Sequence, residues 1–268
     1  KAVRSLDIDK DLGYSGKYTN WTDEDIRSLL KTPTDERLFA IYQALKRGIS
    51  TDEISEITGI EPYFLYRIEN IINVEQIIKK NLNPETLRKA KRTGFTDEQI
   101  AKITSKTREE ITDLRHELGI IPTYKMVDTC AAEFEAKTPY YYSSYDTECE
   151  LVPTDRKKVL ILGSGPIRIG QGIEFDYCTV HAVIALREQG IEAHIVNNNP
   201  ETVSTDYDTS DKLFFEPVTL EDVMNIIEKE KPYGVLVQFG GQTAINLAIP
   251  LEKEIARLGL KTKILGTS

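Results

Sequence analysis

Apolar positions between residues 20 and 118 recur every three or four residues, which predicts short amphipathic helices. One helix places Leu38, Ile41 and Leu45 on a single face and ends before Gly48. Thr22 and Asn83 stand where helix N-caps are expected, since each precedes a new periodic segment. The first part of the chain is therefore predicted to be an all-α bundle.

A weak internal repeat runs through this helical part. The segment "GISTDEISEIT" from Gly48 resembles "GFTDEQIAKIT" from Gly94 and aligns Ile54 with Ile100. Each copy is followed by a second helix, an arrangement that raises the alternative of a DNA-binding helix-turn-helix. The candidate recognition helix 107–118 has four acids and two arginines, whereas DNA binding needs basic side chains facing phosphates. Helix packing or subunit contact is the favoured use.

The second part changes character at Lys157. Short apolar runs such as "KKVLILG", "EAHIVNNN", "GVLVQFGG" and "TKILGTS" alternate with helical patterns, which is typical of parallel strands buried on both faces. Strand and helix alternation predicts an α/β fold, a Rossmann-like parallel sheet covered by right-handed crossovers. Residues 1–153 are predicted to form the helical domain with an extended connector, and residues 154–268 the α/β domain.

The connector is rich in tyrosine, with four between residues 140 and 145. Interleaved aromatic residues can stack on single-stranded bases, but that use requires basic neighbours, and this segment is acidic. The simpler interpretation is an extended segment whose tyrosines dock it onto both domains.

Composition narrows the function. The net charge is −9, and residues 1–125 contain 21 basic and 21 acidic residues, so the whole acidic excess lies in the second part. Nucleic acid is therefore an unfavoured partner.

No apolar run is long enough to span a bilayer, and no signal peptide is recognisable, which predicts a cytoplasmic protein. The three cysteines and three histidines show no metal-ligand spacing, so no metal site is expected.

A glycine-rich loop follows the first predicted strand, with Gly163, Gly165, Gly170 and Gly172. A dinucleotide-binding fingerprint would place a glycine near Arg168 and an acid after the second strand, where the chain has three asparagines. The Gly-Lys-Ser/Thr of a P-loop is absent as well. Packing explains Gly163 and Gly165 readily, whereas Gly170 and Gly172 indicate a close approach of the backbone to a ligand or a neighbouring domain.

Two other loops contain residues that occur in ligand sites. The segment "QFGGQT", with Gly240, Gly241, Gln242 and Thr243, lies between a strand and a helix start, which suits either a bound anion or a simple turn. The segment 200–211 contains three aspartates but has neither the central glycine nor the terminal glutamate of an EF-hand. A solvated or interface loop is the favoured interpretation there.

Together, "LGSGPIRIGQGIEFDYCTVHA", "VNNNPETVSTDYDTSDKLFFEPVTLEDV" and "QFGGQT" resemble the large chain of carbamoyl-phosphate synthases, in the pre-ATP-grasp subdomain of the carbamoyl-phosphate-forming half. The helical part resembles the oligomerisation domain of that family, through "YKMVDTCAAEFEAKTPYYYSSYDTECE" at its end. The resemblance covers essentially the whole chain. The absent initiator Met is consistent with an excised part of a longer protein.

The resemblance implies an ATP-dependent, glutamine-hydrolysing ligase of arginine and pyrimidine biosynthesis. Such enzymes make carbamoyl phosphate from bicarbonate, ammonia and two ATP, with Mg²⁺ or Mn²⁺ and with K⁺ as a further candidate. The ATP- and metal-binding residues of the family belong to ATP-grasp domains outside this chain, so no cofactor and no catalytic residue is expected here. The expected partners are those ATP-grasp domains, a glutaminase small subunit and a second copy bound through the helical domain.

Within the family, the glycine loop forms one wall of an active site and of the passage that carries carbamate between two ATP-grasp sites. The resemblance assigns that wall to Arg168, Gln171, Gly172 and Glu174, with Gly172 keeping the passage open. The rival hypothesis is a stand-alone regulatory helix-turn-helix or nucleotide-binding protein. The neutral-to-acidic helical surface favours the synthase.

Overall fold

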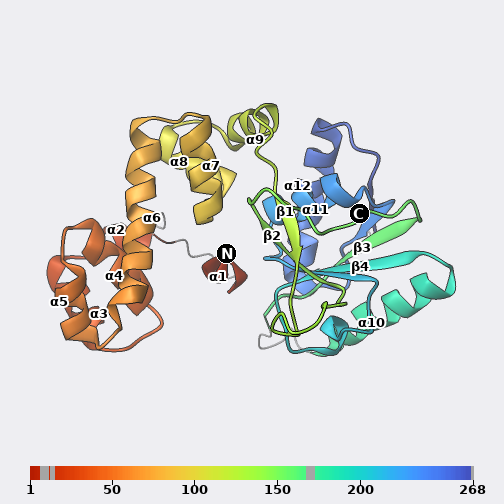
Figure 1. Ribbon diagram of the computed structural model, residues 1–268, viewed down its shortest axis with the longest axis horizontal. Coiled ribbons are helices and arrows are strands. Elements are labelled where there is room, and N and C mark those ends of the chain that lie inside the picture. Colours follow the sequence, from red (N-terminus) through yellow and green to blue (C-terminus); the bar gives the residue numbers. More distant parts are fainter. Residues whose placement is uncertain (7–11, 13–15, 167–172, 267–268) are drawn as a thin grey trace. The chain divides into compact units, whose positions relative to one another are not determined.

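The computed structural model describes residues 1–6, 12, 16–166 and 173–266. The chain divides into two compact units, of which one contains residues 8–120 and the other residues 1–7 and 121–268. The first is called the helical unit here and the second the α/β unit. Figure 1 labels the elements of both.

The helical unit consists of helices, as the hydrophobic pattern predicts. Within its described residues they are α2 (Gly16–Thr19), α3 (Asp23–Lys31), α4 (Arg37–Lys46), α5 (Thr51–Thr58), α6 (Pro62–Lys80), α7 (Pro84–Thr93), α8 (Asp97–Thr104) and α9 (Arg108–Glu117). Thr22 and Asn83 are N-caps whose side chains accept hydrogen bonds from backbone N–H groups of the first helical turn. Local signals therefore define the helix starts.

The internal repeat is confirmed. Gly48 and Gly94, which precede α5 and α8, have φ angles of 88° and 104°, a left-handed conformation that glycine adopts without strain. Ile54 and Ile100 occupy equivalent, fully buried positions. One detail of α4 differs from the periodic expectation, since Leu38 is 37% exposed and its neighbour Phe39 is buried in its place.

The α/β unit contains a seven-stranded sheet in the order β1-β2-β5-β4-β3-β6-β7. Its elements are α1 (Ala2–Ser5), β1 (Thr123–Met126), β2 (Tyr140–Ser144), β3 (Lys158–Leu162), α10 (Ile173–Glu188), β4 (Glu192–Asn197), the 3₁₀ turn η1 (Val203–Thr205), β5 (Lys212–Phe215), α11 (Leu220–Glu230), β6 (Gly234–Leu236), α12 (Gly241–Arg257) and β7 (Lys263–Leu265). The strands from β3 to β7 are parallel, which confirms the predicted α/β fold.

The predicted connector supplies two more strands. Strands β1 and β2 pair antiparallel, and β2 continues the sheet by pairing parallel to β5. Tyr141 and Tyr124 pack their rings against Phe214 of β5. The connector is thus extended, as expected, but most of it belongs to the compact α/β unit, whose border lies at residue 120/121.

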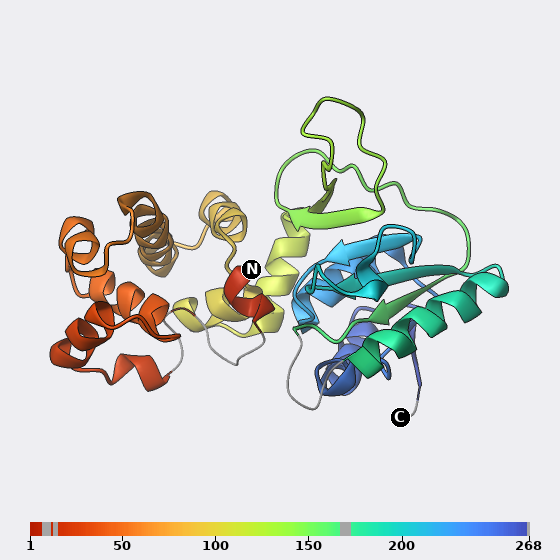
Figure 2. The same ribbon diagram turned by 90° about the horizontal axis from the view of Figure 1, so that it is seen from below.

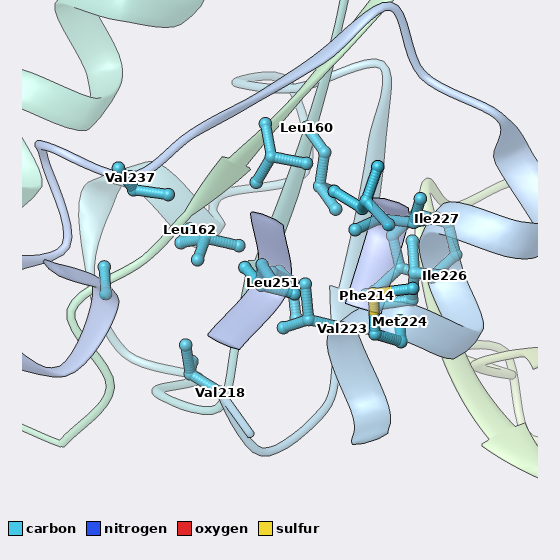
Figure 3. Close-up of a cluster of buried hydrophobic side chains, with 14 of the residues drawn as sticks. Leu160, Leu162, Phe214, Val218, Val223, Met224, Ile226, Ile227, Val237 and Leu251 are labelled. Carbon is cyan, nitrogen blue, oxygen red and sulfur yellow. The ribbon is translucent and has the colours of Figure 1, made fainter. Parts of the chain in front are cut away.

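The sheet separates two apolar layers. Leu160 and Leu162 of β3 point into a core with Phe214 and with residues of α11 and α12, of which Val223, Ile227 and Leu251 are labelled in Figure 3. Val159 and Ile161 face the other side, where they pack with Ala182 and Val183 of α10, the helix that lies along the sheet in Figure 2. Strand alternation therefore fixes which helix covers which face. Among the described residues, no helix is both long and apolar enough to cross a membrane.

Candidate functional site

Three loops meet at the carboxyl edge of the sheet. Strand β3 lies between β4 and β6, so the chain moves away from β3 in both directions along the sheet. Ligands of doubly wound sheets bind at such a switch point, outside the carboxyl ends of the strands. The loops that begin at Gly163, Asn198 and Val237 follow those three strands. The segments with the family resemblance therefore converge where this fold class binds ligands.

Asn197 fastens the glycine loop to the neighbouring strand. Its buried side-chain Oδ1 accepts hydrogen bonds from the N–H groups of Gly165 at 3.1 Å and Asn198 at 2.9 Å. A Cβ atom at Gly163 would lie 2.6 Å from the Cγ of Asn197. Gly163 is thus required for packing, and the amide that occupies the place of a ribose-binding acid binds the protein's own backbone.

Gly240, in the segment "QFGGQT", packs directly against the backbone at the start of the glycine-rich loop. A Cβ atom at Gly240 would lie 2.5 Å from the carbonyl oxygens of both Leu162 and Gly163. Gly241 follows with a φ of 63° and begins α12. The Gln242 side chain donates to Oδ1 of Asn246, one turn further along α12, at 2.6 Å, and Thr243 lies in the same first turn. Close backbone packing explains Gly240, and the left-handed backbone conformation explains Gly241.

The predicted wall residues are only partly described. Arg168, Gly170, Gln171 and Gly172 lie outside the described residues. Glu174 is exposed in the first turn of α10. Two residues further along α10, Asp176 is buried and accepts hydrogen bonds from the backbone N–H of Ser204, which joins α10 to η1. The assignment of the wall therefore stays a prediction.

The N-terminal segment contacts this edge of the α/β unit, which the sequence pattern did not indicate. The Asn198 side chain donates to the backbone oxygen of Ser5 at 2.5 Å. Nearby, the Lys1 side chain binds Oε1 of the buried Glu216 at 2.8 Å. Burial, reinforced by the charge of Asp222, raises the pKa of Glu216 above its usual value despite the opposing charge of Lys1. Contacts between residues almost 200 positions apart leave no periodic signal.

No group of three or more His, Cys, Asp or Glu side chains among the described residues could hold a metal ion. In the aspartate-rich loop, Asp211 accepts the N–H of Ala193 at 2.8 Å and lies 3.5 Å from Arg187. That carboxylate therefore anchors the loop to β4 and α10.

The helix-turn-helix alternative depends on the two arginines of α9, the candidate recognition helix. On α9, Arg115 is buried and its Nε lies 3.0 Å from Asp97. Arg108 lies 2.9 Å from Glu109 of the same helix. Both arginines of the candidate recognition helix are thus paired with acids and cannot neutralise DNA phosphates.

Comparison with known proteins agrees with the sequence resemblance. Residues 155–268 match the family described as "Carbamoyl phosphate synthase preATP-grasp domain", and residues 1–119 match "Carbamoyl-phosphate synthetase large chain, oligomerisation domain". The whole chain is 75% identical to part of the carbamoyl phosphate synthase large chain of Methanothrix thermoacetophila, 64% to that of Methanosarcina mazei and 56% to that of Methanobrevibacter smithii.

The fold and the loops define a protein with a helical unit and a Rossmann-like α/β unit. The chain belongs to the family of carbamoyl phosphate synthase large chains. It spans about a quarter of the length of the curated relatives it matches, for example 25% of the Methanothrix thermoacetophila protein and 24% of the Methanobrevibacter smithii protein. The relatives give no support to a stand-alone regulatory protein.

Proposed function

We propose that this chain serves, within a complete large chain, as an assembly domain and as one wall of the second active site and of the carbamate passage. The complete enzyme would make carbamoyl phosphate from bicarbonate, ammonia released from glutamine, and two ATP. The observation that carries the proposal is the convergence of the three family-like loops at the switch point of the sheet.

The residues of this chain would contribute shape and not bond-making chemistry. Gly163 and Gly240 hold the starts of two loops in direct backbone contact. Glu174 would face the passage together with Arg168, Gln171 and Gly172. Positioning of reactants contributes much of the rate in phosphoryl transfer, so the shape of such a wall would affect the rate.

The same proposal covers the partners and the location. ATP, with Mg²⁺ or Mn²⁺ and K⁺ as a further candidate, would bind to ATP-grasp domains of the large chain, and a glutaminase small subunit would supply ammonia. The helical unit would join copies of the large chain. We expect the enzyme in the cytoplasm, and we expect the separate chain to be inactive.

The test uses the complete enzyme with its small subunit. Replacing Gly172 by Phe should narrow the passage, so more ATP would be hydrolysed for each carbamoyl phosphate formed. The matched control is Gly190→Asn, because Gly190 has a φ of 69°, which Asn tolerates, and nothing lies within 4 Å of an added Cβ. Unchanged coupling of ATP hydrolysis to product formation in Gly172→Phe would overturn the assignment of the wall.

A further inference from the structure

A cleft in the helical unit has a composition that helix packing does not explain. It has a volume of about 770 Å³ and lies between one face of α6 and one face of α7. It is lined by Arg67, Asn70, Ile71, Glu85, Arg88, Lys89, Arg92 and Thr93. Four of these eight residues are basic and one is acidic, although residues 1–125 as a whole are neutral.

The sequence of α7 directs its charges to this cleft. Leu87, Ala90 and Lys91 form the buried face of the helix, and Lys91 is neutralised there by Asp97 at 2.7 Å. The remaining basic residues of the helix, Arg88, Lys89 and Arg92, are exposed and line the cleft. Like charges four residues apart on a helix, such as Arg88 and Arg92, repel each other. The exposed face of α7 therefore concentrates positive charge at the cleft.

Two of these cations, Arg88 and Lys89, are not paired with any residue that the structure describes. Among the residues that the structure describes, the side chains of Arg88 and Lys89 form no ion pair and no hydrogen bond. Across the cleft, Arg67 is held in place, because its Nη2 donates to the hydroxyl of Tyr63 at 2.9 Å and its guanidinium lies 4.9 Å from the centre of that ring. The cleft thus combines a fixed arginine with two unneutralised cations.

We propose that this cleft binds a small polyphosphorylated molecule. Planar guanidinium groups bind phosphate oxygens in pairs, and lysine adds a mobile positive charge. The volume lies within the range of roughly 300–1,000 Å³ that small-molecule sites occupy, which favours a compact ligand over a protein surface. Ile71 offers the cleft a half-buried apolar side chain, against which a non-phosphate part of the ligand would pack. The cleft belongs to the helical unit, whereas the proposed active-site wall belongs to the α/β unit.

The test titrates the 268-residue chain with inorganic tripolyphosphate in a calorimeter at low and at physiological salt. We expect saturable binding to one site per chain, weakened by salt because the contacts are ionic. Arg88→Gln combined with Lys89→Gln should weaken binding at least tenfold. Arg67→Gln, on α6 across the cleft, should weaken binding as well. If binding required only the cations of α7, Arg67→Gln would leave it unchanged.

The matched control is Lys79→Gln combined with Lys80→Gln. This pair also removes two adjacent exposed cations from a helix of the same unit, but neither residue lines the cleft. Binding within twofold of the unmodified chain is expected. Equal weakening in the control and in the cleft variant would show non-specific attraction and overturn the proposal, as would absent saturation.

If the cleft binds a protein surface instead of a small molecule, the titration and the sedimentation experiment give a different result. If the chain self-associates in a salt-sensitive way that Arg88→Gln with Lys89→Gln abolishes, and tripolyphosphate does not bind saturably, the cleft is an interface for an acidic surface. That result would overturn the small-ligand proposal. Sedimentation of the same samples distinguishes the two outcomes, and far-UV circular dichroism of every variant shows that the helices are retained.

Discussion

The two units bury charge in different ways. In the helical unit, Asp97 lies 2.7 Å from Lys91 and 3.0 Å from Arg115 and also accepts the hydroxyl of Thr112. Burial alone would raise the pKa of Asp97, but the charges of Lys91 and Arg115 outweigh it and hold that pKa at about 2. This carboxylate is a counter-ion that two buried cations share.

In the α/β unit, two lysines are buried beside a histidine. Lys158 and Lys212 both bind Glu230, at 3.4 Å and 2.9 Å, and donate to backbone oxygens of the connector. Burial, reinforced by the charges of these lysines, lowers the pKa of His194 to about 3. The buried cluster around Asp97 in the helical unit is therefore fully ionised. The buried cluster in the α/β unit includes a neutral side chain, that of His194. The difference predicts distinct responses to mutation and to pH.

The largest expected effect is on the helical unit. Asp97→Asn removes the carboxylate that the buried Lys91 and Arg115 share, and removing one partner of a buried ion pair costs about 3–5 kcal/mol. Hydrogen exchange of peptides from residues 84–120 should report this loss of unfolding free energy, while peptides of the α/β unit keep their protection. Unchanged protection of residues 84–120 would contradict the central role of Asp97.

A second substitution tests the rigidity of the α/β unit, where shape depends on distant contacts. Gly240→Ala forces a Cβ to within 2.5 Å of two backbone oxygens, which cannot rotate away. We expect a loss of about 3 kcal/mol, at the upper end of overpacking costs. Hydrogen exchange of the loop after β3 and of α12 measures it. Gly190→Asn serves as the control, and an equally small effect of both changes would show that the loops adjust easily.

The stabilities of the two units should also depend on pH in different ways. Unfolded chains protonate histidine near pH 6.5, but folded His194 does so only near pH 3, so the stability of the α/β unit falls as pH drops between these values. The loss is about 1.4 kcal/mol for each pH unit below 6.5, hence about 2 kcal/mol at pH 5. His194→Phe should remove this part of the slope in urea unfolding, and an unchanged slope would exclude His194 as its origin.

Asp97 titrates in another range. Because its pKa is lowered, its contribution is complete above the usual aspartate pKa of about 3.9 and is lost as pH falls through about 2. Between pH 6.5 and pH 4.5 the cluster around Asp97 should therefore keep its stability while the α/β unit loses part of its own.

The smallest effect is expected at the surface. Glu98, next to Asp97 in the chain, forms an exposed pair with Lys102 at 3.2 Å. Glu98→Gln should change the unfolding free energy of the helical unit by less than about 1 kcal/mol, because solvent screens such pairs. Urea unfolding alongside Asp97→Asn gives the comparison, and similar losses in both variants would show that burial is not what distinguishes Asp97.

Local patterns in the sequence determined the helices, most parallel strands and the family. N-caps such as Thr22 and Asn83 act within three residues, and the repeat around Gly48 and Gly94 is visible in the letters alone. The short strand β5 was missed, because its four residues carry too little pattern. The wall residues Arg168, Gln171, Gly172 and Glu174 are predicted from the family motif and not from periodicity.

Contacts between distant positions were decided only by the tertiary structure. The sequence could not show that Gly240 touches the backbone at Leu162 and Gly163, that the connector pairs with β5, or that Lys91 and Asp97 are neutralised inside the helical unit. Nor could it show that Arg67 of α6 and Arg88 of α7 line one cleft. Periodicity records which side of an element is buried, whereas the partner on that side is set by how the elements pack.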